Sequence, residues 1–502
     1  MAAMTKPAVG EEPAPDATML TIYSKLQPGA VPPELYRPGA QTQMYGQPLT
    51  VPGYGVVKQE RSLKLDAGRS SIRFTDVASQ IDPTTVTFAS LTDPAGTRVL
   101  EQNYEFDLVS VEKLMQRFLD QPIALEQVLG QQVKTIEGTL LSARGAVLLR
   151  KDDGSVQVVN GYSNVFLPQL PQGLITKPTL VWDVQTTQAG THRTRVTYET
   201  EGLTWWADYN LIFAEGKDAN SGLLDVGAWV SIVNQSGATY RDARLKLIAG
   251  EVHRAPQPEP MMARGARAKM AMAESAMDMG FEEKEFFEYH LYTLGRPTTL
   301  PDNSTKQLEL FPLVAKVPCE KVLVYYGLAE GYRGFFASPM VDRNYGTQGN
   351  KKVDIYLKFK NEKGIGMGMP LPGGRIRVSK LDPADGTLEF IGEDKIDHTP
   401  KDEIVLIKMG SAFDVVGERT QTDFQIDTKR NWLEETVEIK VRNHKKEAVN
   451  VIVKENLFRW LTWEIKQATQ EYEKADARTV HFPVKIEPDG EVTIRYTARY
   501  TW

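Results

Sequence analysis

The residues best suited to chemistry form a short acidic run with one histidine, late in the chain. They are Glu393, Asp394, Asp397, His398, Asp402 and Glu403. Carboxylate and imidazole groups bind cations, and two carboxylates brought together can exchange protons with a substrate. The same composition is typical of a solvated loop between two strands, which is the interpretation we favour. The weak metal candidates are therefore Asp394, Asp397, His398 and Asp402.

A methionine-rich bridge offers a different kind of metal site. Thioether sulfurs suit copper(I), and histidines flank the bridge on both sides. The residues concerned are Met270, Met272, Met277, Met279, His253 and His290. Because alanine and glycine make up much of the rest of the bridge, we favour a disordered segment without a copper site.

Two short motifs place tryptophans close together and suggest a contact surface. The residues are Trp205, Trp206, Trp460 and Trp463. Exposed indole rings stack on sugars or anchor a protein partner, whereas buried rings pack a core. Packing is the commoner role, and a ligand or partner contact stays open as the alternative.

The common catalytic signatures are missing from the sequence. There is no G-x-S-x-G elbow, H-E-x-x-H zinc motif, P-loop or C-x-x-C pair. The glycines at 364–368 resemble half of a dinucleotide fingerprint but run into a proline-rich segment, so a loop is the better interpretation. Cys319, the only cysteine, is expected to be a small buried hydrophobe. We therefore predict no catalytic residue and no cofactor.

Composition limits the classes of function further. The chain has 502 residues, of which 41% are hydrophobic and 25% charged, with a formal net charge of −6. This balance indicates a globular protein of more than one domain and disfavours nucleic-acid binding. No apolar run reaches the length of a membrane span, and the start lacks the apolar core of a signal peptide. A native leader removed from the sequence stays open.

The pattern of elements predicts an all-β, multidomain protein. Short alternating runs separated by Gly, Pro, Asn and Asp turns favour antiparallel β-sandwich domains with a small SH3-like barrel. We expect a flexible arm at 1–54 with one strand near 19–23, followed by a β domain with a short helix at 55–122. The barrel should span 123–178. The sandwich region should comprise 179–254 and 286–502, with a disordered bridge at 255–285 between them.

Two elements have the clearest patterns. Ser110 is a suitable N-cap for a short helix, with Val111, Leu114, Met115 and Phe118 on one face that should dock on a sheet. Apolar and polar residues alternate strictly in the strand at 492–502, so one face should pack in the core and the other should be exposed to solvent.

Several motifs resemble a bacterial family catalogued as a domain of unknown function, some members of which are labelled mucoidy-inhibitor-like. They are GLTWWADY at 202–209, NQSG at 234–237, LKLIAG at 245–250, YHLY at 289–292, TKQ at 305–307, MPLPGGRIRV at 369–378 and LEFIGE at 388–393. The resemblance covers 174–502 best. It implies all-β architecture and a periplasmic or cell-envelope location, and it brings no catalytic residue. Many relatives have a coiled coil where this chain has only the short helix and the small barrel.

The leading hypothesis is a non-enzymatic envelope protein that acts by binding or assembly, with protein partners or self-association. Exposed strand edges and loops are the usual contact surfaces of such proteins. The alternatives are a carbohydrate-binding protein that uses the tryptophan pairs on a polysaccharide, and a hydrolase whose acid pair comes from residues 393–403. Cell fractionation would discriminate the first hypothesis, and exposure of the indole rings the second.

Overall fold

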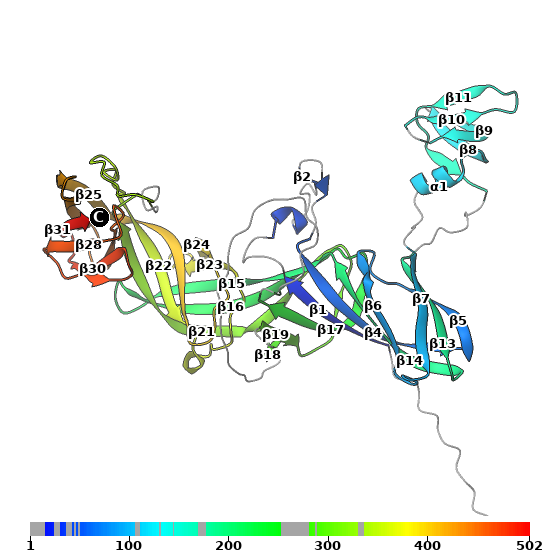
Figure 1. The fold of residues 1–502 in the computed structure, drawn as a ribbon, viewed down its shortest axis with the longest axis horizontal. Coiled ribbons are helices and arrows are strands. Elements are labelled where there is room, and N and C mark those ends of the chain that lie inside the picture. Colours follow the sequence, from blue (N-terminus) through cyan, green and yellow to red (C-terminus); the bar gives the residue numbers. More distant parts are fainter. Residues whose placement is uncertain are drawn as a thin grey trace, which may run out of the picture.

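The computed structural model describes most of the chain, and Figure 1 shows its strands. The described residues are 16–24, 31–36, 43–44, 47–48, 51–105, 111–129, 132–143, 145–168, 177–250, 252, 281–286, 289–329 and 336–502. Within them the elements are overwhelmingly strands, arranged in several sheets with separate cores. The all-β, multidomain prediction is confirmed.

Two sheets form the N-terminal part. The larger has eight strands and contains, in order, β18 (Phe281–Phe286), β19 (Tyr289–Leu294), β17 (Tyr240–Ala249), β1 (Ala17–Ser24), β4 (Gly53–Leu65), β14 (Gly190–Glu201) and β6 (Ile81–Ser90), with β20 (Thr298–Leu300) beside β17. The smaller contains β5 (Gly68–Thr75), β13 (Thr179–Thr186) and β7 (Thr97–Glu105). Trp182 of β13 is fully buried and its ring lies against those of Phe74 and Phe88. The two sheets therefore share one core.

The predicted arm contains an integral strand. β1 pairs in parallel with β17 and antiparallel with β4, and its Leu20 and Ile22 are fully buried. Alternating apolar residues explain the strand, because each of them can face the core. Further along, Val31 and Leu35 pack on Trp206 beside a short 3₁₀ turn (Pro33–Leu35). The rest of the arm's proposed flexible part lies largely outside the described residues, apart from the two-residue pair β2 (Gln43–Met44) and β3 (Gln47–Pro48).

A small five-stranded sheet and the helix form a unit with its own core. The strands are, in order, β11 (Val156–Val159), β10 (Val147–Arg150), β9 (Gln132–Ser142), β8 (Pro122–Leu129) and β12 (Asn164–Phe166). Helix α1 (Val111–Arg117) contributes Met115, followed by Phe118, to the same cluster as Leu125 and Leu140. The helix docks on a sheet as expected; its predicted N-cap, Ser110, lies outside the described residues.

The expected domain boundaries need correction. The helix belongs to the small sheet, not to the unit that we placed at 55–122, because its buried side chains pack there. Strand pairing also joins residues on both sides of this unit: β4 pairs with β14, and β5 and β7 pair with β13. The small unit is thus an insertion in the N-terminal part. Residues 281–285, assigned to a disordered bridge, form strand β18, while 253–280 lie outside the described residues.

The remaining strands form one thirteen-stranded sheet that serves two cores. Its order is β24 (Leu388–Ile396), β23 (Gly374–Leu381), β15 (Leu203–Glu215), β16 (Ser221–Asn234), β21 (Ser304–Tyr326), β22 (Lys352–Lys360), β25 (Ile404–Asp427), β26 (Trp432–Asn443), β31 (Glu491–Thr501) and β28 (Trp463–Ala468), joined by β27 (Val449–Asn456), β30 (Thr479–Ile486) and β29 (Glu473–Lys474). The long strands β21 and β25 run from one core to the other (Figure 1).

The first part of this sheet curls into a barrel. The backbone N–H of Lys408 on β25 donates to Asp394 Oδ2 on β24 at 2.6 Å, so the two ends of the curl meet. Tyr209, Val378 and Ile407 are among the buried residues inside. We call the strands from β24 to the first half of β25 the central barrel. The second part is a C-terminal sandwich, in which Tyr496 and Tyr500 of β31 face the core as the alternation predicted.

A buried asparagine locks the end of a strand at corresponding places in the two parts. Asn443, at the end of β26, donates through Nδ2 to the carbonyls of Glu447, Ile486 and Glu487 at 2.8, 3.3 and 3.1 Å. Asn234, at the end of β16, binds the carbonyls of Ala238, Leu300 and Pro301 in the same way. Each side chain replaces ladder hydrogen bonds that end with the strand.

Replacing Asn443 by alanine should lower the free energy of unfolding of the C-terminal sandwich by about 2–3 kcal/mol, because buried carbonyls lose their donor. Urea unfolding, monitored by limited proteolysis, measures this change in the free energy of unfolding. Asn450, exposed on β27 of the same sandwich, is the matched control, and its alanine variant should stay within about 0.5 kcal/mol. Equal losses in both variants would contradict the proposed lock.

Candidate functional site

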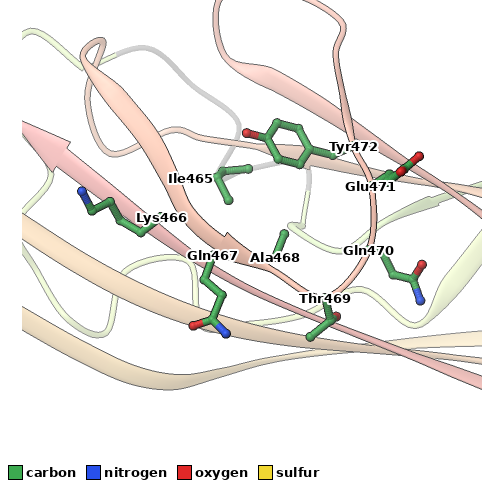
Figure 2. A pocket seen from close by; sticks show the side chains of 8 residues that line it. All are labelled: Ile465, Lys466, Gln467, Ala468, Thr469, Gln470, Glu471 and Tyr472. Atoms are coloured by element: carbon green, nitrogen blue, oxygen red, sulfur yellow. The ribbon is translucent and has the colours of Figure 1, made fainter.

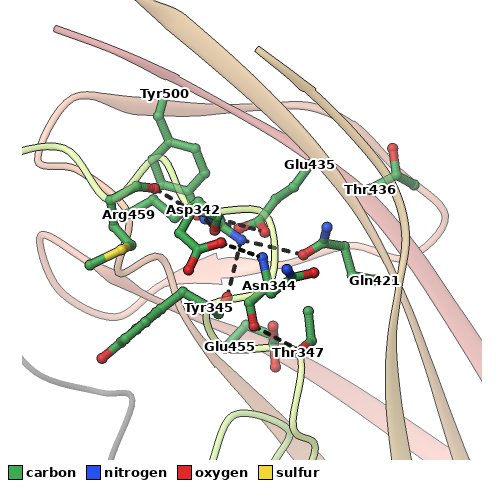
Figure 3. A network of polar contacts seen from close by, with 12 residues as sticks. Asp342, Asn344, Tyr345, Thr347, Gln421, Glu435, Thr436, Glu455, Arg459 and Tyr500 are labelled. Carbon is green, nitrogen blue, oxygen red and sulfur yellow. Dashed lines mark hydrogen bonds and ion pairs between the residues drawn. The ribbon is translucent and has the colours of Figure 1, made fainter.

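The densest group of chemically capable side chains lies inside the C-terminal sandwich (Figure 3). Arg459 is fully buried and donates through Nε to Glu435 Oε2 at 2.8 Å. Its other nitrogens donate to the backbone carbonyls of Met340, Asp342 and Tyr345, at 3.0, 2.8 and 3.2 Å. One guanidinium therefore fixes the segment before β22 to the sheet.

A second buried ion pair lies in the same network. Arg419 Nε donates to Glu455 Oε2 at 2.9 Å, and the hydroxyl of Tyr496 donates to the same oxygen. Burial, and then the charge of Glu455, raise the pKa of Tyr496 well above its ordinary value. Tyr496 therefore stays a hydrogen-bond donor at all physiological pH values. Tyr500 donates to Glu435 at 3.1 Å in the corresponding way.

This network has the features of a structural cluster. Side chains of Arg419, Glu455, Arg459 and Glu435 are at most 2% exposed, so a substrate cannot reach the carboxylates. Each carboxylate is already neutralised by a guanidinium and hydrogen-bonded to a phenol. Buried, paired charges of this kind fix one arrangement of the surrounding backbone. We therefore do not assign catalysis to them.

The acidic run predicted from the sequence is dispersed along and beyond strand β24. Asp394 accepts backbone N–H groups from Lys395 and Lys408, at 2.8 and 2.6 Å, and Glu393 pairs with Arg377 at 2.9 Å. His398 Nδ1 accepts the N–H of Gly373 at 2.9 Å. Among the residues that the structure describes, no three His, Cys, Asp or Glu side chains form a group that could hold a metal ion. Asp397 and Asp402 are exposed.

The structure disfavours the ligand-contact alternative for one of the two tryptophan pairs. Trp205 is 3% exposed and donates to the carbonyl of Ile248 at 3.2 Å, while Trp206 is 6% exposed and donates to Asp208 Oδ2 at 2.7 Å. Neither ring can stack on a sugar, because Trp205 packs in the core and Val31 and Leu35 pack on Trp206. Trp460 and Trp463 are half-buried against the C-terminal core. Packing, the role that the sequence favoured, describes these four rings better than an exposed ligand surface does.

Cys319 lies on β21 with 7% of its surface exposed, as the sequence predicted. Burial raises the pKa of its thiol to about 11. At pH 8 only about one molecule in a thousand then carries the reactive thiolate. We expect the native protein to resist labelling by iodoacetamide at this pH and the urea-unfolded protein to react fully, as measured by intact mass. Rapid labelling of the native chain would contradict this burial.

The remaining sequence candidates have simple positions. The glycine-rich segment contains a 3₁₀ turn (Lys363–Ile365), after which Gly366 and Gly368 have φ of 83° and 100°. It is therefore a loop before β23 and not the start of a helix. His290 pairs with Glu283 at 2.6 Å. The methionine bridge and His253 lie outside the described residues.

A hollow on the surface of the C-terminal sandwich is wide open to solvent (Figure 2). It measures about 560 Å³ and lies on β28 and the loop after it, where Ile465, Gln467, Thr469, Gln470 and Tyr472 line it. An active site is usually a deeper cleft that excludes water. The shape of this hollow gives no support to the hydrolase alternative.

The most distinctive surface feature is an apolar row on the outside of the central barrel. It crosses five adjacent strands at one end of the barrel: Pro318 (β21), Leu223 (β16), Ala214 (β15), Leu381 (β23) and Leu388 (β24). Leu223 pairs with Pro318 and with Ala214, and Leu381 pairs with Leu388. Since Phe213 pairs with Lys380, Ala214 lies beside Leu381.

A large aromatic ring extends this row. Phe390 lies two residues after Leu388, on the same face of β24, opposite Ser379. The exposed fractions are 37% for Leu223, 50% for Leu381, 53% for Leu388 and 62% for Phe390. We call these four residues with Pro318 and Ala214 the outer apolar face. Single exposed apolar residues need no explanation, but a continuous row that crosses several strands marks a contact surface.

Sequence reasoning did not identify the outer apolar face. Its residues come from five strands far apart in the chain, and only strand order and register bring them together. The local signal was present at LEFIGE (388–393), where consecutive apolar residues interrupt the alternation of a half-buried strand. A one-residue bulge at Ile391 puts Gly392 inside the barrel and Phe390 outside it.

The described helices include none that is long and apolar enough to span a membrane. The comparisons with protein families, with curated proteins and with solved structures found no match to this chain. The resemblance to the mucoidy-inhibitor-like family thus stays an expectation from the quoted motifs.

Proposed function

We propose that this chain is a non-enzymatic protein that acts by binding a protein partner through the outer apolar face. The supporting observation is the exposure of Leu381, Leu388 and Phe390 side by side on β23 and β24. Burying three such side chains against a partner would contribute several kcal/mol, at roughly 25 cal/mol per Å² of apolar surface. Location in the bacterial cell envelope is part of the proposal and rests on the resemblance alone.

Two other functions receive less support. A carbohydrate-binding role needs exposed rings, and Trp205 and Trp206 are buried. A hydrolase needs two carboxylates together in a cleft, whereas Asp394 and Glu393 are engaged by backbone N–H groups and by Arg377. The exposed Asp397 and Asp402 do not line the hollow of Figure 2. We therefore place the binding role first.

Site-specific photo-crosslinking in native cells tests the proposal. A benzoylphenylalanine at position 390 should give one discrete crosslinked partner, identified by mass spectrometry. The same probe at Leu100, 40% exposed on β7 in another sheet, is the matched control and should give none. The purified partner should then bind the Leu388→Ser chain about ten-fold more weakly than the unaltered chain.

Two results would overturn the proposal. The first is the same adduct pattern from positions 390 and 100, which would mean that the contacts are not specific to this face. The second is turnover of a defined substrate that a single substitution elsewhere abolishes.

A further inference from the structure

We infer that the outer apolar face receives a basic amphipathic polypeptide, whose apolar side chains are flanked by lysine or arginine. This inference rests on the proposed function and adds the chemistry of the partner. It follows from the charges that border the face on the hairpin between β23 and β24.

This hairpin carries three carboxylates, two of which border its exposed apolar residues. Asp382 and Asp385 lie in the turn between Leu381 and Leu388, and Glu389 lies between Leu388 and Phe390. Asp385 and Glu389 are exposed, and Asp382 is half-buried. A partner that covers Leu381, Leu388 and Phe390 would therefore approach the charges of Asp382 and Asp385 in the turn, whereas Glu389, paired with Lys380, points to the opposite face of β24.

Hydrogen bonds hold these carboxylates in place and keep at least one of them ionised. Asp382 Oδ1 accepts the N–H of Ala384 at 2.8 Å. Asp385 Oδ1 accepts the N–H and the hydroxyl of Thr387, at 2.9 and 2.7 Å, and Glu389 accepts the same hydroxyl at 3.0 Å. The bonds from Thr387 lower the pKa of Asp385, so its charge persists in mildly acidic solution.

The neighbouring cations do not cancel this charge. Lys380, the nearest lysine in the chain, gives its ammonium to Glu215 at 2.6 Å. Arg377, which lies on the same face of β23 as Leu381, pairs with Glu393 at 2.9 Å. Asp382 and Asp385 thus present an acidic border next to an apolar surface, and Glu389 adds negative charge to the same hairpin.

This border decides between the candidate occupants. Two copies that met through the same hairpin would bring like charges together, and a membrane rich in anionic lipid would be repelled in the same way. Lysine or arginine beside apolar side chains would satisfy both parts of the surface. Charge complementarity therefore favours a basic segment of another protein.

Binding of two synthetic probes to the full chain tests the inference. One fluorescein-labelled peptide alternates leucine with lysine, and the other alternates leucine with glutamate at the same length. Fluorescence anisotropy should give about ten-fold tighter binding of the lysine peptide, and this preference should shrink at high salt because the contacts are exposed.

Matched variants connect the preference to the hairpin. The triple variant Asp382→Asn, Asp385→Asn, Glu389→Gln keeps the hydrogen-bond acceptors of the turn and should remove the preference for lysine. Leu388→Ser with Phe390→Ser should abolish binding of both peptides. Glu101→Gln, an exposed carboxylate on β7, is the control and should change neither affinity.

The outcomes separate this inference from the proposed function. Equal binding of both peptides through Leu388 and Phe390 overturns the charge inference and leaves the proposed function standing. Dimers of the unaltered chain that the double serine variant does not form would assign the face to a second copy. Binding to phosphatidylglycerol vesicles would assign it to a membrane. Either result would also overturn the charge inference. A preference for lysine that survives the triple variant, or no binding of either peptide, contradicts it as well.

Discussion

The Arg459→Met chain should lose about 3–5 kcal/mol of the free energy of unfolding of its C-terminal sandwich. The substitution leaves Glu435 as a buried charge without its guanidinium, and it removes the donor to the carbonyls of Met340, Asp342 and Tyr345. Urea unfolding, monitored by tryptophan fluorescence and by limited proteolysis, measures this loss of stability. Proteolysis should also begin near residues 340–346, because Arg459 holds that segment.

A double-mutant cycle separates the ion pair from the rest of the network. Adding Glu435→Gln to Arg459→Met should recover part of the lost stability, because the unpaired buried charge is removed. Arg495→Met is the control, since Arg495 is about half exposed and its contact with Glu438 is 3.4 Å long. A loss below 1 kcal/mol in Arg459→Met, or the same loss in Arg495→Met, would show that the network does not fix this part of the fold.

Trp182→Ala should destabilise the N-terminal part by about 3–5 kcal/mol, the usual cost of removing a large buried aromatic side chain. Trp182 is fully buried, donates to Gln102 Oε1 at 2.8 Å and lies between Phe74 and Phe88. Proteolytic cleavage within residues 53–105, measured at increasing urea concentrations, gives the unfolding of this part separately from that of the C-terminal sandwich.

Trp182→Phe is the graded control for this position. It keeps the ring contacts and loses only the indole N–H, so it should cost less than half as much as Trp182→Ala. If the two variants were equally unstable, the hydrogen bond to Gln102 would be the dominant contribution. If neither lost stability, Trp182 would not join the two sheets.

The sequence predicted the class of fold because alternation is a local property. The strand at 492–502 shows this directly: Tyr496 and Tyr500 face the core because successive side chains point to opposite faces. The short helix was recognised for a similar reason, since Met115 and Phe118 recur at helical spacing. Such patterns need no knowledge of which strands become neighbours.

The division of the chain could not be predicted in the same way. β1, at the start of the chain, lies between β4 and β17, and pairing of this kind is decided by long-range packing. The small unit with α1 interrupts the N-terminal part, and strands β5 and β7 before it pair with β13 after it. No local composition marks an insertion between strands that pair with each other.

The candidate site was missed for the same physical reason. Tryptophans attract attention in a sequence, but whether Trp205 is exposed depends on its neighbours in the barrel. Leu223, Leu381 and Leu388 are ordinary leucines until strand register aligns them on the outer face. The buried pair Arg459 and Glu435 is similarly invisible, because the two residues come from separate segments.

The size of the particle that contains this chain in native cells tests the central claim most directly. Light scattering on the gently extracted, size-fractionated protein should find the unaltered chain in an assembly clearly heavier than the monomer. The folded Leu388→Ser, Phe390→Ser variant should run as a monomer, whereas the Leu100→Ser control should stay in the assembly. A monomeric unaltered chain, or an assembly that all three forms enter equally, would contradict a binding role for the outer apolar face.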